Sequence, residues 1–115
     1  MVNVYEDRFY YGEEGNRIIA SVRNNTNLDY WDGRNFYNGG LGLHKGITKL
    51  KDGRYVIIIN SDWQGERNYA YVVSKREALE EILESGNLEL LKEKRFAELK
   101  MMHDELKDKE ELDEE

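Results

Sequence analysis

Aromatic and polar side chains suited to binding gather in one short stretch, SDWQGERNYAYVVS, residues 61–74. Aromatic rings beside an arginine offer a large contact area at little entropic cost, so they suit the stacking of a base or the anchoring of a partner protein. The alternative is that these rings fill a core layer of the domain. The candidate binding residues of this stretch are Trp63, Gln64, Arg67, Tyr69 and Tyr71.

A second cluster, DYWDGRNFYNGG, spans residues 29–40 and is also rich in rings. Aromatic loops that end in glycines can form the rim of a ligand site or a contact in an interface. The alternative is an ordinary hairpin around Asp32 and Gly33, a dipeptide that suits a two-residue turn. From this cluster we select Trp31 and Arg34 as candidate binding residues.

No motif in the chain predicts catalysis or a cofactor. GGLGLHKG, residues 39–46, lacks the Gly-Lys-Ser/Thr ending of a phosphate-binding P-loop. The acidic and amide residues of the second cluster do not follow the calcium-loop pattern, and the absence of cysteine excludes thiolate zinc sites and disulfides. The enzyme alternative with most support is a small metal-independent nuclease that would use His44, Lys45 and Arg34.

The net charge of −7 is concentrated at the C-terminus. Residues 104–115 hold eight acidic residues and two lysines, so the rest of the chain is nearly neutral. We expect residues 110–115 to form a frayed acidic tail, and residues 1–109 to form a single domain. A chain without a basic patch is not expected to bind nucleic acid directly, and one without a long apolar run is not expected to cross a membrane, so we expect a cytoplasmic protein.

Twelve of the 13 aromatic residues lie before residue 72, whereas good helix formers dominate after Ser74. The pattern predicts an α+β domain with an antiparallel sheet of about five or six strands in residues 2–73, followed by two helices. Expected strands cover residues 2–11, 17–23, 44–51, 54–60 and 67–73, and residues 28–38 could add a short hairpin.

The run Tyr55–Ile59 is apolar without alternation, which is typical of a central strand buried on both faces. We expect the helices to cover the face that holds Ala70 and Val72, and Tyr69 and Tyr71 to line the opposite face. That second face would then need a curled sheet, the N-terminal hairpin or another protein chain to cover it.

Two helices are predicted at residues 75–85 and about 88–109. Ser74 and Glu77 form a capping box at the start of the first, and Gly86 suits its end. The second would be about 33 Å long, so that its last turns would project beyond the body. Because apolar residues continue onto those turns, we expect a homodimer formed through Met101, Met102 and Leu106. The alternative is that these residues fold back onto the sheet.

Residues 52–83 combine an apolar strand, a W-Q-G turn, a second strand and an S-x-x-E-A helix start. In this combination the chain resembles short uncharacterised proteins of Gram-positive bacteria and their phages. Its small size, acidity and lack of cysteine also resemble phage accessory proteins that inhibit host defence. The resemblance implies a protein of the host cytoplasm that binds and blocks a host protein, or that sequesters a nucleotide messenger.

These observations predict a non-catalytic binding protein that acts through its aromatic sheet and loop surface. In one version the surface holds a host defence protein. In the alternative version, a pocket at the dimer interface holds a nucleotide-like ligand, with tyrosines stacked on its base and arginines at its phosphates.

Overall fold

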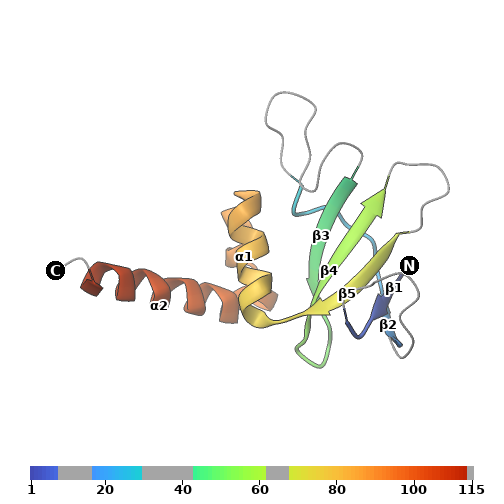
Figure 1. The fold of residues 1–115 in the computed structure, drawn as a ribbon, viewed down its shortest axis with the longest axis horizontal. Helices are drawn as coiled ribbons and strands as arrows, with labels where there is room; N and C mark the ends of the chain where they lie inside the picture. The colour runs from blue at the N-terminus through green and yellow to red at the C-terminus, as the bar shows by residue number, and fades with distance from the viewer. Residues whose placement is uncertain (8–16, 30–42, 62–67, 114–115) are drawn as a thin grey trace.

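The computed structural model describes residues 1–7, 17–29, 43–61 and 68–113, and confirms an α+β fold. Five strands form one sheet in the order β2-β1-β5-β4-β3, with two helices after the last strand (Figure 1). The strands are β1 (Val2–Tyr5), β2 (Ile18–Val22), β3 (Leu43–Lys49), β4 (Tyr55–Ser61) and β5 (Tyr69–Val73).

Strands β3, β4 and β5 form an antiparallel meander, as predicted. Asp52 and Gly53 make the turn between β3 and β4, where Gly53 adopts a φ of 96°, which only glycine tolerates readily. The apolar strand β4 is the second from the edge and lies between two partners. Most of the predicted hairpin at residues 28–38 falls outside the described residues.

One strand pair departs from the antiparallel expectation, because β1 and β5 run parallel. Strand β1 forms an antiparallel hairpin with β2 and joins the meander through β5. Since β1 and β5 lie far apart in the sequence, no tight turn between them imposes antiparallel pairing.

The first helix, α1 (Lys75–Ser85), matches its predicted bounds. Its first turn is capped because the Ser74 hydroxyl accepts a hydrogen bond from the Glu77 N–H, and Gly86 ends it with a φ of 74°. The second predicted helix is divided into two 3-10 turns, η1 (Leu88–Lys92) and η2 (Lys94–Phe96), and a helix α2 (Ala97–Asp113).

The break at Glu93 has a packing reason. Leu91 and Phe96 are both buried, yet residues five apart point about 140° away from each other on a continuous α-helix. The extended backbone at Glu93, with ψ of 139°, allows both side chains to face the core. From there α2 leads away from the sheet, as the projecting end in Figure 1 shows, and the molecule measures 52 Å along its longest axis.

The structure reverses the prediction of which face of the sheet meets the helices. Tyr71, Val73 and Tyr55 face the helices and form one core with α1, η1, η2 and the start of α2. Ala70, Val56 and Ile58 face the other side, where Val2 and Val4 of β1 complete a second buried cluster. The prediction was therefore wrong about which face meets the helices. Large rings fill the deep space beneath a helix layer better than Ala70 does.

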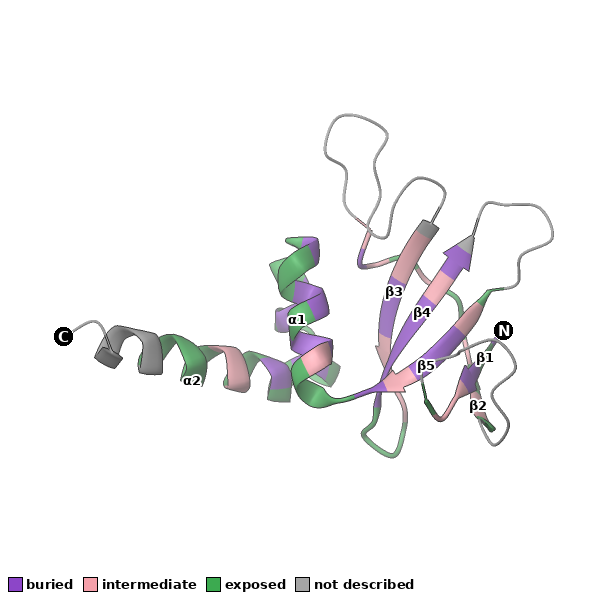
Figure 2. Cartoon of the chain, viewed as in Figure 1, coloured by how far each residue is buried: buried purple, intermediate pink, exposed green. Residues whose placement is uncertain are grey.

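The second face is covered within the chain itself. Ala70, Val56 and Ile58 are buried there together with the N-terminal hairpin residues Val2 and Val4, so the sheet needs no second chain to bury this cluster (Figure 2). Among the described residues, the cluster is completed by the N-terminal hairpin, which is itself part of the sheet because β1 pairs with β5.

A short segment fastens the outer edge of β3, and we call residues 25–29 the edge strap. The backbone groups of Lys45 and Ile47 point away from β4, so they lack a strand partner. The Asn27 side chain accepts from the Ile47 N–H at 2.7 Å and donates to the Ile47 carbonyl at 3.0 Å. The Leu28 N–H donates to the Lys45 carbonyl at 3.1 Å, and the Lys45 N–H donates to Asp29 Oδ1 at 2.8 Å.

The edge strap also passes from one face of the sheet to the other. Asn25 lies over Gly46, on the face of the second cluster, whereas Leu28 is fully buried in the core beneath the helices. The Asn60 amide donates to the Asn25 carbonyl at 3.2 Å, and the Asn87 amide donates to the Asn27 carbonyl at 3.0 Å. Neighbouring elements thus fix the strap on both sides of the edge.

Gly46 allows this crossing, and replacing it with alanine tests its importance. A Cβ at Gly46 would overlap the amide oxygen and the backbone carbonyl of Asn25, and would lie 2.8 Å from its carbonyl carbon. We expect Gly46→Ala to lower the free energy of unfolding in urea by about 1–3 kcal/mol. Adding Asn25→Gly should leave most of this loss, because the backbone overlap remains. If Gly46→Ala were as stable as the wild type, the edge strap could not pass as close to Gly46 as the structure shows.

Tyr55 makes stability depend on pH in the alkaline range. Its ring is buried against Phe96, and its hydroxyl forms no hydrogen bond with any described residue. Burial, and then the charge of Glu98, raise the pKa of the Tyr55 phenol. In the unfolded chain a tyrosine ionises at about pH 10. Above that pH the unfolded state loses a proton that the native state keeps, so stability falls as pH rises towards the native pKa.

We therefore expect Tyr55→Phe to flatten this alkaline decline. At neutral pH the variant should be as stable as the wild type or up to about 1 kcal/mol more stable, because an unpaired buried hydroxyl is removed. Urea unfolding between pH 8 and about pH 11 measures both effects. Tyr5→Phe, at a half-buried position in β1, serves as the control and should retain the decline. If Tyr55→Phe loses as much stability at alkaline pH as the wild type does, the loss is caused by other groups.

Candidate functional site

The segments that carry most of the candidate binding residues join the sheet at the same end. Strand β3 begins beside the end of β4, where Leu43 pairs with Ser61, and β5 begins beside β4, where Ile59 pairs with Tyr69. Segments 30–42 and 62–67 are therefore both attached where β3 begins, β4 ends and β5 begins. We call this region the loop end of the sheet.

Asp29 and His44 form the best-defined polar pair at the loop end. Asp29 is the last residue of the edge strap, and its Oδ2 is hydrogen-bonded to His44 Nδ1. Because an ionised carboxylate can only accept, Nδ1 carries the hydrogen of this bond. The two side chains are 14% and 17% exposed, so the pair is mostly shielded from water. Asp29 thus uses one oxygen to fasten the β3 backbone and the other to orient the imidazole.

A second polar pair joins β3 to α1. Lys45 Nζ lies 3.3 Å from Glu81 Oε2, and the two side chains are 20% and 11% exposed. Glu81 is buried among the apolar residues of α1, and Lys45 is the charged group that compensates it. Because Lys45 pairs with a helix residue, it points to the helix face, and His44 next to it on the strand points to the other face.

Asn60 adds a buried amide to the loop end. It pairs with His44 across β3 and β4 and is 6% exposed. Its amide nitrogen donates to the strap at Asn25, whereas its Oδ1 has no hydrogen-bond partner among the described residues. The base of the loop end is therefore built from polar side chains that are held by the edge strap.

This geometry bears on the nuclease alternative. His44 and Lys45 lie on opposite faces of β3, and Lys45 is occupied by Glu81, so the two do not converge on one substrate position. Arg34 lies outside the described residues. Among residues 1–7, 17–29, 43–61 and 68–113, no group of three or more acidic or histidine side chains is placed to hold a metal ion.

Five of the seven predicted binding residues lie outside the described residues, namely Trp31, Arg34, Trp63, Gln64 and Arg67. The other two are on β5 and face the helices, where the rings of Tyr69 and Tyr71 stack with centroids 6.3 Å apart. Tyr69 is half-buried at the loop end, but Tyr71 is only 3% exposed and belongs to the core. A partner can therefore reach Tyr69 but not Tyr71.

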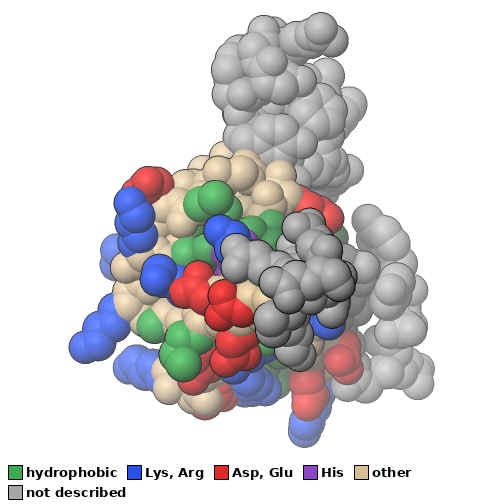
Figure 3. Space-filling model, turned by 90° about the vertical axis from the view of Figure 1, so that its left-hand side faces the viewer, with side chains coloured by type: hydrophobic (Ala, Val, Ile, Leu, Met, Phe, Trp, Pro, Cys, Tyr) green, Lys and Arg blue, Asp and Glu red, His purple; other side chains and the backbone are tan. Residues whose placement is uncertain are grey.

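The predicted dimerisation residues do not form one stripe on α2. Met102 is half-buried and packs against the core, Met101 is 63% exposed, and Leu106 is 36% exposed. Residues 101 and 106 are five apart and point about 140° away from each other. Leu106 continues the buried line of Leu99 and Met102 beyond the body. Figure 3, which views the helix side, shows acidic and basic side chains around small hydrophobic areas there.

Sequence reasoning missed the residues that build the edge strap. The asparagines of NNTN, residues 24–27, directly follow the second predicted strand, and asparagine side chains commonly bond to backbone groups. That tendency was the one signal available. Which backbone they would bond to depends on the distant strand β3, which the local pattern does not reveal.

Comparisons with models of known families, with curated proteins and with solved structures give no match. Among the described residues, no helix is long and apolar enough to span a membrane.

The double role of Asp29 can be tested by substitution. Asp29→Ala removes both of its bonds, and we expect it to lower the free energy of unfolding by about 2–3 kcal/mol, since bonds to charged groups are strong and the Lys45 N–H loses its acceptor. Asp29→Asn keeps an oxygen for that N–H and should lose less. Hydrogen exchange of the Lys45 amide should accelerate in Asp29→Ala and much less in Asp29→Asn.

Asp52→Ala is the matched control, because Asp52 forms an exposed ion pair with Arg54. Exposed ion pairs contribute little to stability, and this variant should leave the Lys45 amide protected. Equal exchange rates for Lys45 in the wild type and Asp29→Ala would show that Asp29 does not fasten the edge.

Proposed function

We propose that the protein is a non-catalytic binding protein whose loop end holds a partner protein. The observation that supports this most is the attachment of the two aromatic segments, 30–42 and 62–67, to the same end of the sheet. Two loops on one end of a rigid scaffold are a common way to build a binding surface. Tryptophan and arginine, which dominate binding energy at interfaces, occur in both segments.

The described base of the loop end supports binding rather than turnover. Asp29 uses both carboxylate oxygens for structural bonds, and Lys45 is paired with Glu81. These contacts hold β3, the edge strap and α1 together at the loop end. A rigid base lowers the entropy that loops lose when they bind, and so favours affinity.

The partner class that we propose is a host defence protein, blocked by direct contact. This follows the resemblance of residues 52–83 to short proteins of Gram-positive bacteria and their phages. In this proposal Trp31 and Trp63 are the anchors, Arg34, Gln64 and Arg67 surround them, and Tyr69 contributes at the base.

Site-specific photo-crosslinking tests where the partner binds. A photoreactive phenylalanine at position 31 or 63 should give the same crosslinked product in host cells. The same group at Ile18 or Leu88, which are exposed on β2 and η1, should give none. With the purified partner, Trp31→Ala and Trp63→Ala should each weaken binding at least tenfold, because such anchors contribute about 2 kcal/mol or more.

Two outcomes would contradict this proposal. One is a product formed equally from all four positions, or a partner affinity that neither tryptophan substitution changes. The other is catalytic turnover of a host substrate that His44→Ala abolishes while partner binding stays intact.

A further inference from the structure

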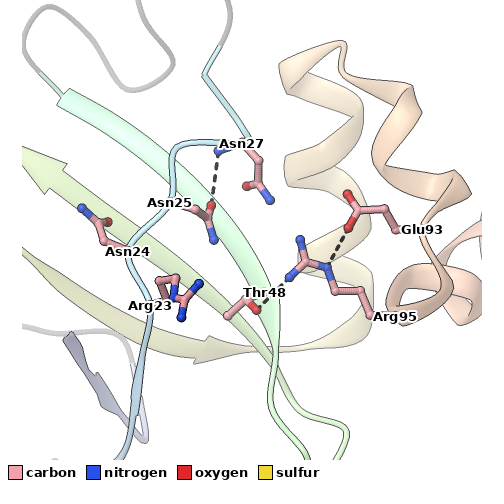
Figure 4. A pocket seen from close by; sticks show the side chains of 7 residues that line it. All are labelled: Arg23, Asn24, Asn25, Asn27, Thr48, Glu93 and Arg95. Atoms are coloured by element: carbon pink, nitrogen blue, oxygen red, sulfur yellow. Dashed lines mark hydrogen bonds and ion pairs between the residues drawn. The ribbon is translucent and has the colours of Figure 1, made fainter.

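A separate hollow lies beside the edge strap, away from the loop end. It has a volume of about 410 Å³ and is bordered by the end of β2, the strap, β3 and the turn between η1 and η2 (Figure 4). This volume falls within the range of roughly 300–1,000 Å³ that is usual for small-molecule sites. All its lining side chains are polar or charged: Arg23, Asn24, Asn25, Asn27, Thr48, Glu93 and Arg95.

Arg95 is held in a fixed orientation at one side of the hollow. Its Nε donates to Glu93 Oε1 at 2.9 Å, and its Nη1 donates to the Thr48 hydroxyl at 3.1 Å. The guanidinium also lies over the ring of Phe96, 4.7 Å from the ring centroid. These contacts use two of the five N–H groups of the guanidinium, so donors remain for a ligand.

Arg23, the residue directly after β2, supplies a second guanidinium. It is exposed and forms no ion pair with any residue that the structure describes. Figure 4 shows its side chain directed towards Thr48, with Arg95 on the other side of that threonine. Two guanidinium groups on one hollow are a suitable pair for an anion with several oxygens, because each can donate two parallel hydrogen bonds.

The charge of the lining selects the ligand class. Two arginines and one glutamate give the hollow a positive charge in a chain whose net charge is −7. The three asparagines add neutral donors and acceptors around the arginines. We propose that this hollow binds a phosphate group, either as free phosphate or as the monoester of a small molecule. The site is distinct from the loop end, and it does not depend on the proposed function.

Glu93 sets the strength of this site. Its carboxylate neutralises part of the charge of Arg95 and would repel a phosphate, and its side chain is 43% exposed, so that it can turn away to solvent. Replacing it with glutamine keeps the size of the side chain and removes the repulsion. Glu93→Gln should therefore bind phosphate more tightly than the wild type.

Isothermal titration calorimetry at low salt tests the proposal, with inorganic phosphate, AMP and adenosine as probes. We expect phosphate and AMP to bind and adenosine not to bind. Arg23→Gln should weaken both about tenfold or more, because it removes charge-assisted hydrogen bonds. Binding should strengthen between about pH 5.5 and pH 7.5, as the phosphate takes up its second charge.

Two comparisons complete the test. Arg76→Gln is the matched control, because Arg76 is an exposed arginine of α1 paired with Glu80, and this variant should bind like the wild type. Equal affinities for phosphate and AMP would identify the free anion as sufficient, whereas tighter AMP binding would identify a monoester. Arg95→Gln should also weaken binding, but it removes the contact with Thr48, so Arg23→Gln is the decisive variant.

The proposal is overturned if neither phosphate nor AMP binds saturably, or if Arg23→Gln and Arg76→Gln bind equally well. It is also overturned if adenosine binds as tightly as AMP, since the phosphate would then contribute nothing. None of these results bears on the loop end, because residues 23 and 76 lie outside it.

Discussion

The unpaired edge of β3 is the constraint on which much of this structure depends. Lys45 and Ile47 direct their backbone groups away from the sheet, and such an edge would otherwise stay open to water or to another chain. The edge strap satisfies these groups with three side chains, Asn25, Asn27 and Asp29, and one backbone N–H. In doing so it links the strand at one end of the sheet order, β2, to the strand at the other end, β3.

The same contact positions both candidate sites. At the loop end, Asp29 fastens β3 and orients His44, so the described base of the loop end depends on the strap. On its other side, Asn25 and Asn27 line the hollow between Arg23 and Arg95. A single segment without regular secondary structure therefore connects a surface suited to a protein partner with a hollow suited to a phosphate.

In the described part of the sheet, two large rings belong to the core rather than to an exposed face. Tyr71 and Tyr55 pack beneath the helices, and the small residue Ala70 lies in the cluster that β1 completes. These two rings therefore stabilise the core and leave almost no surface for a partner to contact. Of the two candidate binding residues that the structure describes, only Tyr69 at the loop end stays partly exposed.

The sequence by itself determined the α+β class, the β3–β4 turn at Gly53, the capped helix between Ser74 and Gly86, and the burial of the run Tyr55–Ile59, in which only Ile59 is half-buried. These features follow from local patterns: positive φ at glycine, a hydroxyl cap, and a continuous apolar run. Only the tertiary structure decided the parallel pairing of β1 with β5, the face on which Tyr71 lies, the break at Glu93 and the strap over Gly46. Each of these depends on contacts between residues distant in the chain, and strand alternation alone fixes which side chains share a face but not which face meets the helices.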